Sequence, residues 1–210
     1  MIKNLLFDFG GVIFSQNPLS EPIKRFEQLG FVNVRDFTGD HGQRGFFLEL
    51  EKGLITEDEF IDQLEQECHR QLTYKEVQNA WLGFVRDVPL ERLQHLLWFK
   101  ERYNVCMLSN TNAFVQNWAR SDNFDGHGHS IHHYFDTLYC SNELHEYKPD
   151  AAIFEKVLAL GNMERSETIF IDDSMRNIEG ARAVGIPSFH VTEQADWFQP
   201  LKDFIETQNK

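Results

Sequence analysis

Three short apolar segments of this chain each run directly into polar residues. Short continuous apolar runs are typical of strands in a parallel sheet that is buried on both faces. The carboxyl ends of parallel strands meet at one edge of the sheet, and ligands bind at that edge in open α/β folds. The chain is therefore expected to gather the polar endings at one place. The segments and their endings are residues 4–7 with Asp8, residues 104–108 with Ser109 and Asn110, and residues 167–171 with Asp172 and Asp173.

The first of these segments is followed at once by two glycines, Gly10 and Gly11. Glycine lets the chain turn tightly and brings the backbone close to a ligand. Asp8 is therefore placed as a nucleophile or a metal ligand would be. Taken alone, the segment also fits a strand followed by a turn in which Asp8 is an ordinary capping residue.

Residues 16–86 show helix signals and no strand signal. Ser20 to Gly30 has an early proline and a closing glycine, and a second helix is expected around Phe46 to Glu51. Thr56 and Thr73 each precede a glutamate by three residues, which is the pattern of a capping box. We therefore expect a small helical domain over residues 16–86.

The rest of the chain alternates strands with helices. This alternation predicts an α/β fold, a Rossmann-like parallel sheet covered by helices on both faces and built from residues 1–15 and 87–210. The expected strands are residues 4–8, 104–110, 137–140, 167–173 and 186–191, the expected helices are 89–103, 112–120, 150–160, 174–184 and 193–207, and residues 121–133 are expected to form a loop.

Charge and composition exclude several classes of partner. The 210 residues carry a net charge of −13 and no Lys/Arg run, so neither nucleic acid nor an anionic membrane surface is an expected partner. The first strand is expected by residue 4, which leaves no room for a signal peptide, and no apolar run is long enough to span a bilayer. A cytoplasmic location is expected. Cys106 and Cys140 lie in apolar segments and are interpreted as core thiols rather than metal ligands.

The polar endings, taken in order with one lysine, resemble the motifs of the haloacid dehalogenase (HAD) superfamily, whose members are mostly phosphatases. The resemblance covers nearly the whole chain and is most specific over residues 170–181. The matching residues are Asp8 for the nucleophile, Ser109 for the hydroxyl after the second strand, Lys148 at a helix start for the cation, and Asp172 and Asp173, with Asn177 following, for the acidic pair.

This resemblance implies a Mg²⁺-dependent phosphatase that acts on a small phosphorylated metabolite such as a sugar phosphate. Asp8 would attack phosphorus and form an aspartyl-phosphate. Asp8, Asp173 and the Gly10 carbonyl would hold Mg²⁺, and Asp172 would hold metal-bound water. Ser109 and Asn110 would bind phosphoryl oxygens. Lys148 would neutralise the crowded carboxylates, bind the phosphate and stabilise charge on the transferring group.

One position departs from the family pattern. Phosphatases of this family usually carry a second aspartate two residues after the nucleophile, where it protonates the leaving group, and this chain has Gly10 there. Some members with Asp-x-Gly in this motif are nonetheless regarded as phosphatases. The alternatives left open are a phosphomutase or phosphotransferase, a dehalogenase, and a binding protein that kept the site but lost turnover.

Residues 16–86 lie where the family inserts a cap that selects the substrate, and the sequence does not name that substrate. Within the cap, His41, Gln43 and Arg44 are candidate substrate contacts; Arg44 would bind a substrate anion, although a solvated loop charge is the favoured interpretation. The tract His127–His133 has the side chains of a transition-metal site, but a solvated loop is favoured there too. Either a monomer or a homodimer is compatible with the sequence.

Overall fold

A five-stranded parallel sheet forms the centre of the molecule. The computed structural model describes residues 1–39, 42–192 and 196–209. The strand order is β5-β4-β1-β6-β7, so the first strand is central, with β4 on one side of it and β6 on the other. The α/β prediction is confirmed. The strands are β1 Asn4–Phe7, β4 Asn104–Ser109, β5 Thr137–Cys140, β6 Thr168–Asp172 and β7 Ser188–His190.

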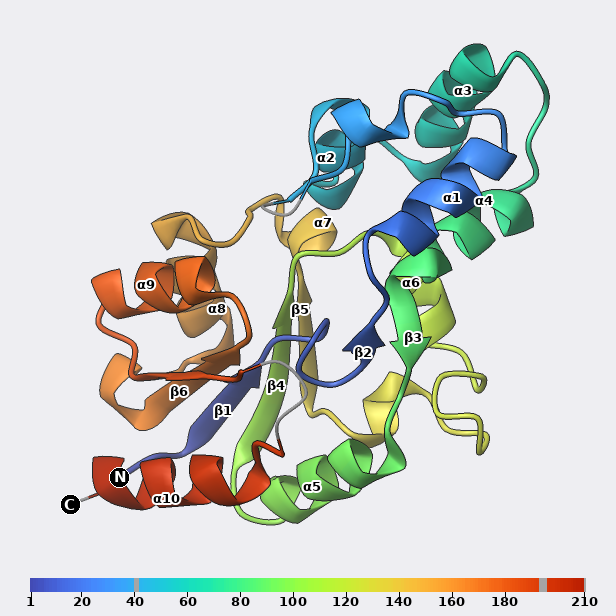
Figure 1. The fold of residues 1–210 in the computed structure, drawn as a ribbon. Helices are drawn as coiled ribbons and strands as arrows, with labels where there is room; N and C mark the ends of the chain where they lie inside the picture. The colour runs from blue at the N-terminus through green and yellow to red at the C-terminus, as the bar shows by residue number, and fades with distance from the viewer. Residues whose placement is uncertain (40–41, 193–195, 210) are drawn as a thin grey trace.

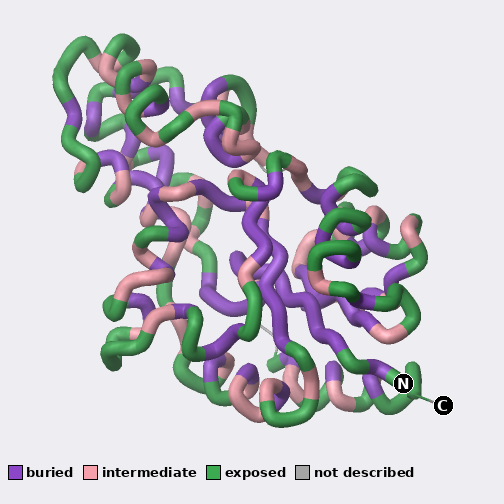
Figure 2. Tube along the Cα trace, turned by 180° about the vertical axis from the view of Figure 1, so that it is seen from behind, coloured by how far each residue is buried: buried purple, intermediate pink, exposed green. Residues whose placement is uncertain are grey.

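Apolar side chains project from both faces of this sheet, as expected for strands that are continuous apolar runs. In β1, Leu5 and Phe7 join one hydrophobic cluster and Leu6 joins the other. Figure 1 shows the helices that cover the two faces, and Figure 2 shows that the strands between them are buried. These helices are α5 Leu90–Lys100, α6 Ala113–Ala119, α7 Ser141–Leu144, α8 Ala151–Gly161, α9 Met175–Ala183 and α10 Phe198–Gln208, with short 3-10 turns at Ile131–His133 and Arg165–Glu167.

A block of helices lies beyond the carboxyl end of the sheet (Figure 1). Its centre is aromatic: the ring centroids of Phe47 lie 5.0 Å from those of Phe26 and Phe60 and 5.1 Å from that of Trp81. Both predicted capping boxes, at Thr56 and Thr73, are present. The helices are α1 Ser20–Gln28, α2 Gly45–Glu51, α3 Glu57–Cys68 and α4 Tyr74–Trp81, with 3-10 turns at Val34–Asp36 and Leu82–Phe84.

The prediction that residues 16–86 contain no strand is wrong at both ends. Strands β2 (Ser15–Gln16) and β3 (Val85–Asp87) pair antiparallel where the chain leaves the sheet and where it returns. Each strand is only two or three residues long, too short to show alternation in a sequence, and the pairing joins residues about 70 positions apart. The segment from 16 to 86 is called the helical insertion below.

Other boundaries differ by a few residues. The last helix begins at Phe198 rather than at 193, and α7 was not predicted because four residues carry no periodicity. Cys106 and Cys140 are buried free thiols, as predicted. Among the residues that the structure describes, no helix is both long and apolar enough to cross a bilayer.

Candidate active site

The polar endings of three adjacent strands come together at the carboxyl edge of the sheet. Phe7 pairs with Met107 on one side and with Ile171 on the other, so the residues that follow lie at one level. The Asp8 backbone N–H donates to the Ile171 carbonyl at 2.7 Å. One carboxylate oxygen from each of Asp8, Asp172 and Asp173 lies within 4.8 Å of the others. The predicted juxtaposition is therefore present.

Lys148 is the cation of this cluster. Its Nζ donates to Asp8 Oδ1 at 2.8 Å, to Asp172 Oδ2 at 2.7 Å and to the Leu108 carbonyl at 2.9 Å. The residue is only 2% exposed, and these contacts use all three of its N–H donors. Lys148 therefore joins the ends of β1, β4 and β6 in a single buried network.

Burial and the neighbouring opposite charge have opposite effects on the pKa values of Asp8 and Lys148. Burial raises the pKa of Asp8; Lys148 acts in the opposite direction, and Asp172 and Asp173 raise the pKa further. For Lys148, burial lowers the pKa, but Asp172 and Asp8 raise it by more, so the ammonium stays charged. Lys148 is thus hydrogen-bonded to two of the three carboxylates of the cluster. A divalent cation beside Asp8 and Asp173 would favour their charged forms, and hard carboxylate oxygens are the ligands that Mg²⁺ prefers.

Asp172 and Asp173 have different surroundings. Asp172 is fully buried; it accepts from the Ser174 N–H at 2.7 Å and from Asn177 Nδ2 at 3.1 and 3.2 Å, in addition to Lys148. Asp173 is half-buried and lines the cavity described below. Asp172 is therefore engaged in holding Lys148, and Asp173 is the more accessible of the two carboxylates.

Ser109 and Asn110 were both predicted to bind phosphate. Ser109 is buried at the end of β4 and its hydroxyl donates to the Asn110 carbonyl at a long 3.4 Å. The Asn110 side chain pairs with the main chain of Lys148 in both directions, at 2.9 and 3.0 Å. Both residues line the cavity, but the Asn110 side chain serves mainly to position Lys148.

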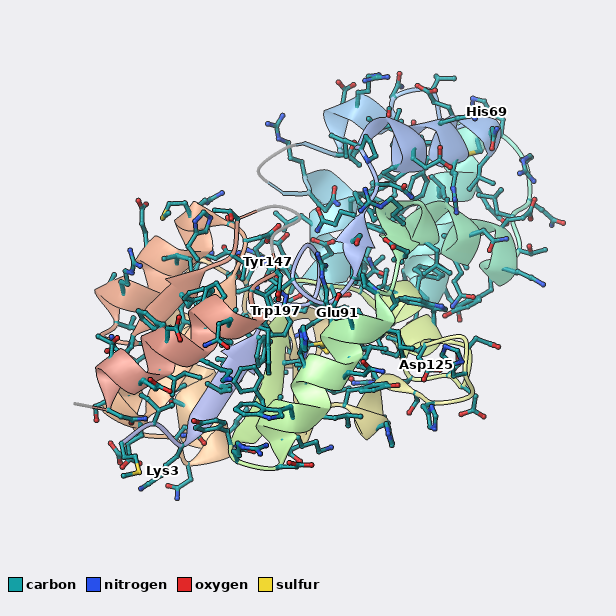
Figure 3. The ribbon with its side chains drawn as sticks, turned by 60° about the horizontal axis from the view of Figure 1, so that its bottom comes forward. Lys3, His69, Glu91, Asp125, Tyr147 and Trp197 are labelled. Atoms are coloured by element: carbon teal, nitrogen blue, oxygen red, sulfur yellow. The ribbon has the colours of Figure 1, made fainter. Side chains whose placement is uncertain are left out.

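A cavity of about 760 Å³ opens above these residues and is lined by both the sheet edge and the helical insertion. Figure 3 shows Tyr147 where these two parts meet. Several lining residues were given no role from the sequence, because each belongs to an element whose function only the fold reveals. They are Gln16, Glu51, Arg86, Tyr147 and Arg176.

Comparison with known proteins identifies the family. A model of the haloacid dehalogenase-like hydrolase family matches residues 2–185. The chain is 39% identical to the D-ribitol-5-phosphate phosphatase of Bacteroides thetaiotaomicron, over 96% of this chain and 97% of that protein. This chain belongs to the haloacid dehalogenase-like hydrolase family.

Solved structures of HAD hydrolases share the whole fold. A HAD-like hydrolase from Porphyromonas gingivalis superimposes with a TM-score of 0.91 at 32% identity, covering 98% of each chain. A HAD enzyme from Bacteroides thetaiotaomicron, in complex with magnesium and inorganic phosphate, gives a TM-score of 0.88 at 34% identity, covering 96% of this chain and 99% of that one. The predicted family resemblance is confirmed.

The two glycines of the first HAD motif have different surroundings. Gly11 has a φ of +75°, and a Cβ there would collide with the Asp173 carboxylate, so glycine is required. Gly10, whose carbonyl was predicted to bind metal, is not at a positive φ, and it lines the cavity. A Cβ at Gly10 would collide with the side-chain amide of Gln16. Gln16 of β2 therefore fills the space beside the position where the family's second aspartate would start.

Two of the three candidates predicted in the helical insertion, Gln43 and Arg44, belong to the described residues. Arg44 is exposed and is not among the residues that line the cavity, so the structure does not bring it to the site. His41 lies outside the described residues, whereas Gln43 does line the cavity.

In the His127–His133 tract, the loop is organised by Asp125, which accepts from the His127 and His129 N–H groups and from Tyr134. Within the described residues, the acidic cluster at the strand ends is the only group of three potential metal ligands, so the tract forms none.

Proposed function

We propose that this chain is a Mg²⁺-dependent phosphatase that hydrolyses a small sugar or alditol phosphate through an aspartyl-phosphate. The observation that carries the proposal is the buried Lys148 ammonium bridging Asp8 and Asp172 at the floor of the cavity. The relatives' names support it, since one is a D-ribitol-5-phosphate phosphatase and another was solved with magnesium and phosphate. Residues 1–15 and 87–210 would form the catalytic domain and residues 16–86 its cap.

The donor set suits Mg²⁺. Asp8 and Asp173, with the Gly10 carbonyl, would hold the ion, and Asp172 would orient its water ligands. When bound, the ion offsets the repulsion between the phosphate dianion and the attacking carboxylate and orients both. No other cofactor is required for the reaction.

The residues of the chain then carry out two transfers. An Asp8 carboxylate oxygen forms a bond to phosphorus as the P–O bond to the leaving oxygen breaks, and that oxygen takes up a proton from water to become the alcohol. A water molecule next attacks phosphorus, releases inorganic phosphate and restores Asp8. Ser109 would hold a phosphoryl oxygen, while Lys148 lowers the pKa of Asp8 against the effect of burial and holds its carboxylate in position.

The proposed partners of this site are small phosphorylated metabolites. Cells retain such anions in the cytoplasm, so we propose a cytoplasmic location for the enzyme. Among the described residues, one chain supplies every group that the proposed reaction uses, so the proposal needs no second copy. We therefore propose a monomer, or a homodimer of independent sites.

Activity should require a divalent cation. We expect phosphate release from D-ribitol 5-phosphate with Mg²⁺ present and none with excess chelator, because the attacking Asp8 carboxylate and its acidic neighbours repel the substrate dianion unless a metal ion lies between them. The measurement is inorganic phosphate over a panel of sugar, alditol and aryl phosphates, with 2-chloropropionate as the dehalogenase substrate. Chloride release in chelator, without phosphatase activity, would contradict the proposal.

Because Gly10 stands where the family usually has the proton-donating aspartate, the enzyme should prefer substrates with good leaving groups. An aryl oxygen tolerates the charge that develops on departure, whereas an alkyl oxygen needs a proton. The wild type should therefore cleave p-nitrophenyl phosphate faster than an alkyl phosphate. Gly10→Asp combined with Gln16→Ala, which clears the space that the amide occupies, should speed the alkyl ester by up to about 10²-fold and the aryl ester by much less.

The single variants serve as controls for this pair. Gly10→Asp alone should speed the alkyl ester by less than the double variant does, because the Gln16 amide must first move away from the new side chain, and Gln16→Ala alone should leave the leaving-group preference unchanged. Equal kcat/KM for alkyl and aryl esters in the wild type would show that another residue already donates the proton.

A further inference from the structure

We infer that Glu51 and Gln43 of the helical insertion, together with Tyr147, form a subsite that binds hydroxyl groups of the substrate's carbon chain. The inference rests on the proposed phosphatase function and names the substrate groups that the enzyme would recognise. All three side chains line the same cavity as Asp8 and Lys148. The phosphate end of that cavity is described above, and this cluster forms part of its wall on the side of the helical insertion.

Glu51 is an unusual residue for its position. It is the last residue of α2, only 7% exposed, and four residues after the fully buried Phe47, which places both on one face of the helix. Burying a carboxyl group is costly unless it is hydrogen-bonded. An apolar residue would serve packing better here, so the carboxyl group calls for a functional explanation.

The contacts of Glu51 hold the carboxyl group in place without saturating it. Tyr147 Oη donates to Glu51 Oε2 at 2.7 Å, and the Gln43 side chain lies close enough to act on the pKa of the Glu51 carboxyl group, in the lowering direction. A carboxylate can accept about four hydrogen bonds, so acceptor capacity remains. Gln43 Oε1 is buried and has no hydrogen-bond partner among the described residues.

The cluster therefore offers acceptor capacity at the Glu51 carboxylate and at Gln43 Oε1. The hydroxyl of Tyr147 is already donated to Glu51, so hydroxyl groups of a ligand can supply the donors for these acceptors. Polyol hydroxyl groups supply such donors without charge. A second carboxylate on the substrate would instead be repelled by Glu51, so the subsite favours sugar or alditol phosphates over phosphorylated acids.

A direct structural link joins this subsite to the phosphate end. The Asn110 side chain, which holds the main chain of Lys148, also lies close enough to Tyr147 to act on its pKa, in the lowering direction. The cavity wall is thus continuous from Lys148 through Asn110 and Tyr147 to Glu51. A phosphate held at Asp8 would leave the carbon chain of the ester to extend along this wall.

The test is Glu51→Gln, which keeps the shape and an acceptor oxygen but removes the charge. At pH 8 with Mg²⁺, we expect the KM for D-ribitol 5-phosphate to rise about tenfold, as for loss of a hydrogen bond to a charged group. The KM for 2-phosphoglycolate should fall, because a like charge is removed. The kcat/KM for p-nitrophenyl phosphate, which has no hydroxyl group, should change less than twofold.

The matched control is Glu49→Gln, which makes the same charge change at an exposed position of the same helix and should alter none of these values. If Glu51→Gln changes all three substrates by one factor, or changes none, the subsite inference is overturned while the phosphatase proposal stands. If the wild type hydrolyses none of the three, the phosphatase proposal fails, and this inference falls with it.

Thermal unfolding separates binding from a structural role. Burial raises the pKa of Glu51 to about 7 from an ordinary value of 4.5, while Tyr147, the ionisable side chain that contacts it, has its own pKa raised further above neutrality. The stability that Glu51 contributes is therefore complete below pH 4.5 and lost as the pH rises through 7. Glu51→Gln should raise Tm at pH 8 and leave it nearly unchanged at pH 5. A lower Tm at both values would mean that Glu51 serves the fold, and would overturn the inference.

Discussion

Asp8→Asn is expected to abolish turnover and to leave the folded protein at least as stable as the wild type. An amide does not attack phosphorus at a useful rate, and loss of a nucleophile lowers kcat by roughly 10⁴- to 10⁶-fold in enzymes where it has been measured. Stability should not fall, because burial and the two neighbouring carboxylates already oppose the charge on Asp8. The asparagine oxygen can still accept from Lys148.

The measurement is kcat for p-nitrophenyl phosphate beside Tm in the absence of metal. Asp122→Asn, at an exposed position in the loop after α6, is the matched control and should change neither value. Activity of Asp8→Asn within tenfold of the wild type would show that another group attacks phosphorus. A large drop in Tm would instead show that the variant fails through folding.

Lys148→Met is expected to lower both stability and activity. The methionine fills a similar volume but leaves Asp8 and Asp172 buried without their cation, and removal of one partner from a buried ion pair costs about 3–5 kcal/mol. Activity should fall by at least about 10²-fold, the effect of removing one preorganised donor from an active site. Urea unfolding without metal, and phosphate release with Mg²⁺, measure the two effects.

A second substitution tests the reason given for this loss. In Lys148→Met/Asp172→Asn the buried charge that lost its partner is removed, so most of the lost free energy of unfolding should return while activity stays low. Mg²⁺ should also stabilise Lys148→Met more than the wild type, since a cation bound only by the folded state compensates the same carboxylates. If neither change restores stability, Lys148 acts through packing rather than charge.

The fold and the floor of the site could be predicted because their signals are local. The three central strands β4, β1 and β6 are continuous apolar runs, and β4 and β6 end in polar residues that the parallel topology places beside Asp8. Lys148 was placed by the family resemblance, since a lone lysine before a helix has no chemical signal of its own. Its contacts with both Asp8 and Asp172 were then found in the structure.

The roof of the cavity could not be predicted in the same way. Gln16 lies in a strand of two residues whose partner is almost 70 positions away, and no local pattern reports such a pairing. Glu51 did leave a signal, since it is an acid on the face of α2 that carries Phe47, but an acid at the end of a helix reads equally well as a surface residue. Arg44 drew attention because of its charge, yet the backbone before α2 leaves it in solvent.

The paired strands β2 and β3 also bear on how such a protein changes over evolutionary time. Because the chain departs and returns at neighbouring points, the ends of the intervening segment are held together by main-chain hydrogen bonds. The entropy of closing that loop grows only slowly with its length, so the segment between Gln16 and Val85 can lengthen, shorten or be exchanged at little cost to the sheet. A lineage can therefore retain one phosphoryl chemistry while acquiring new substrates by replacing a single inserted module.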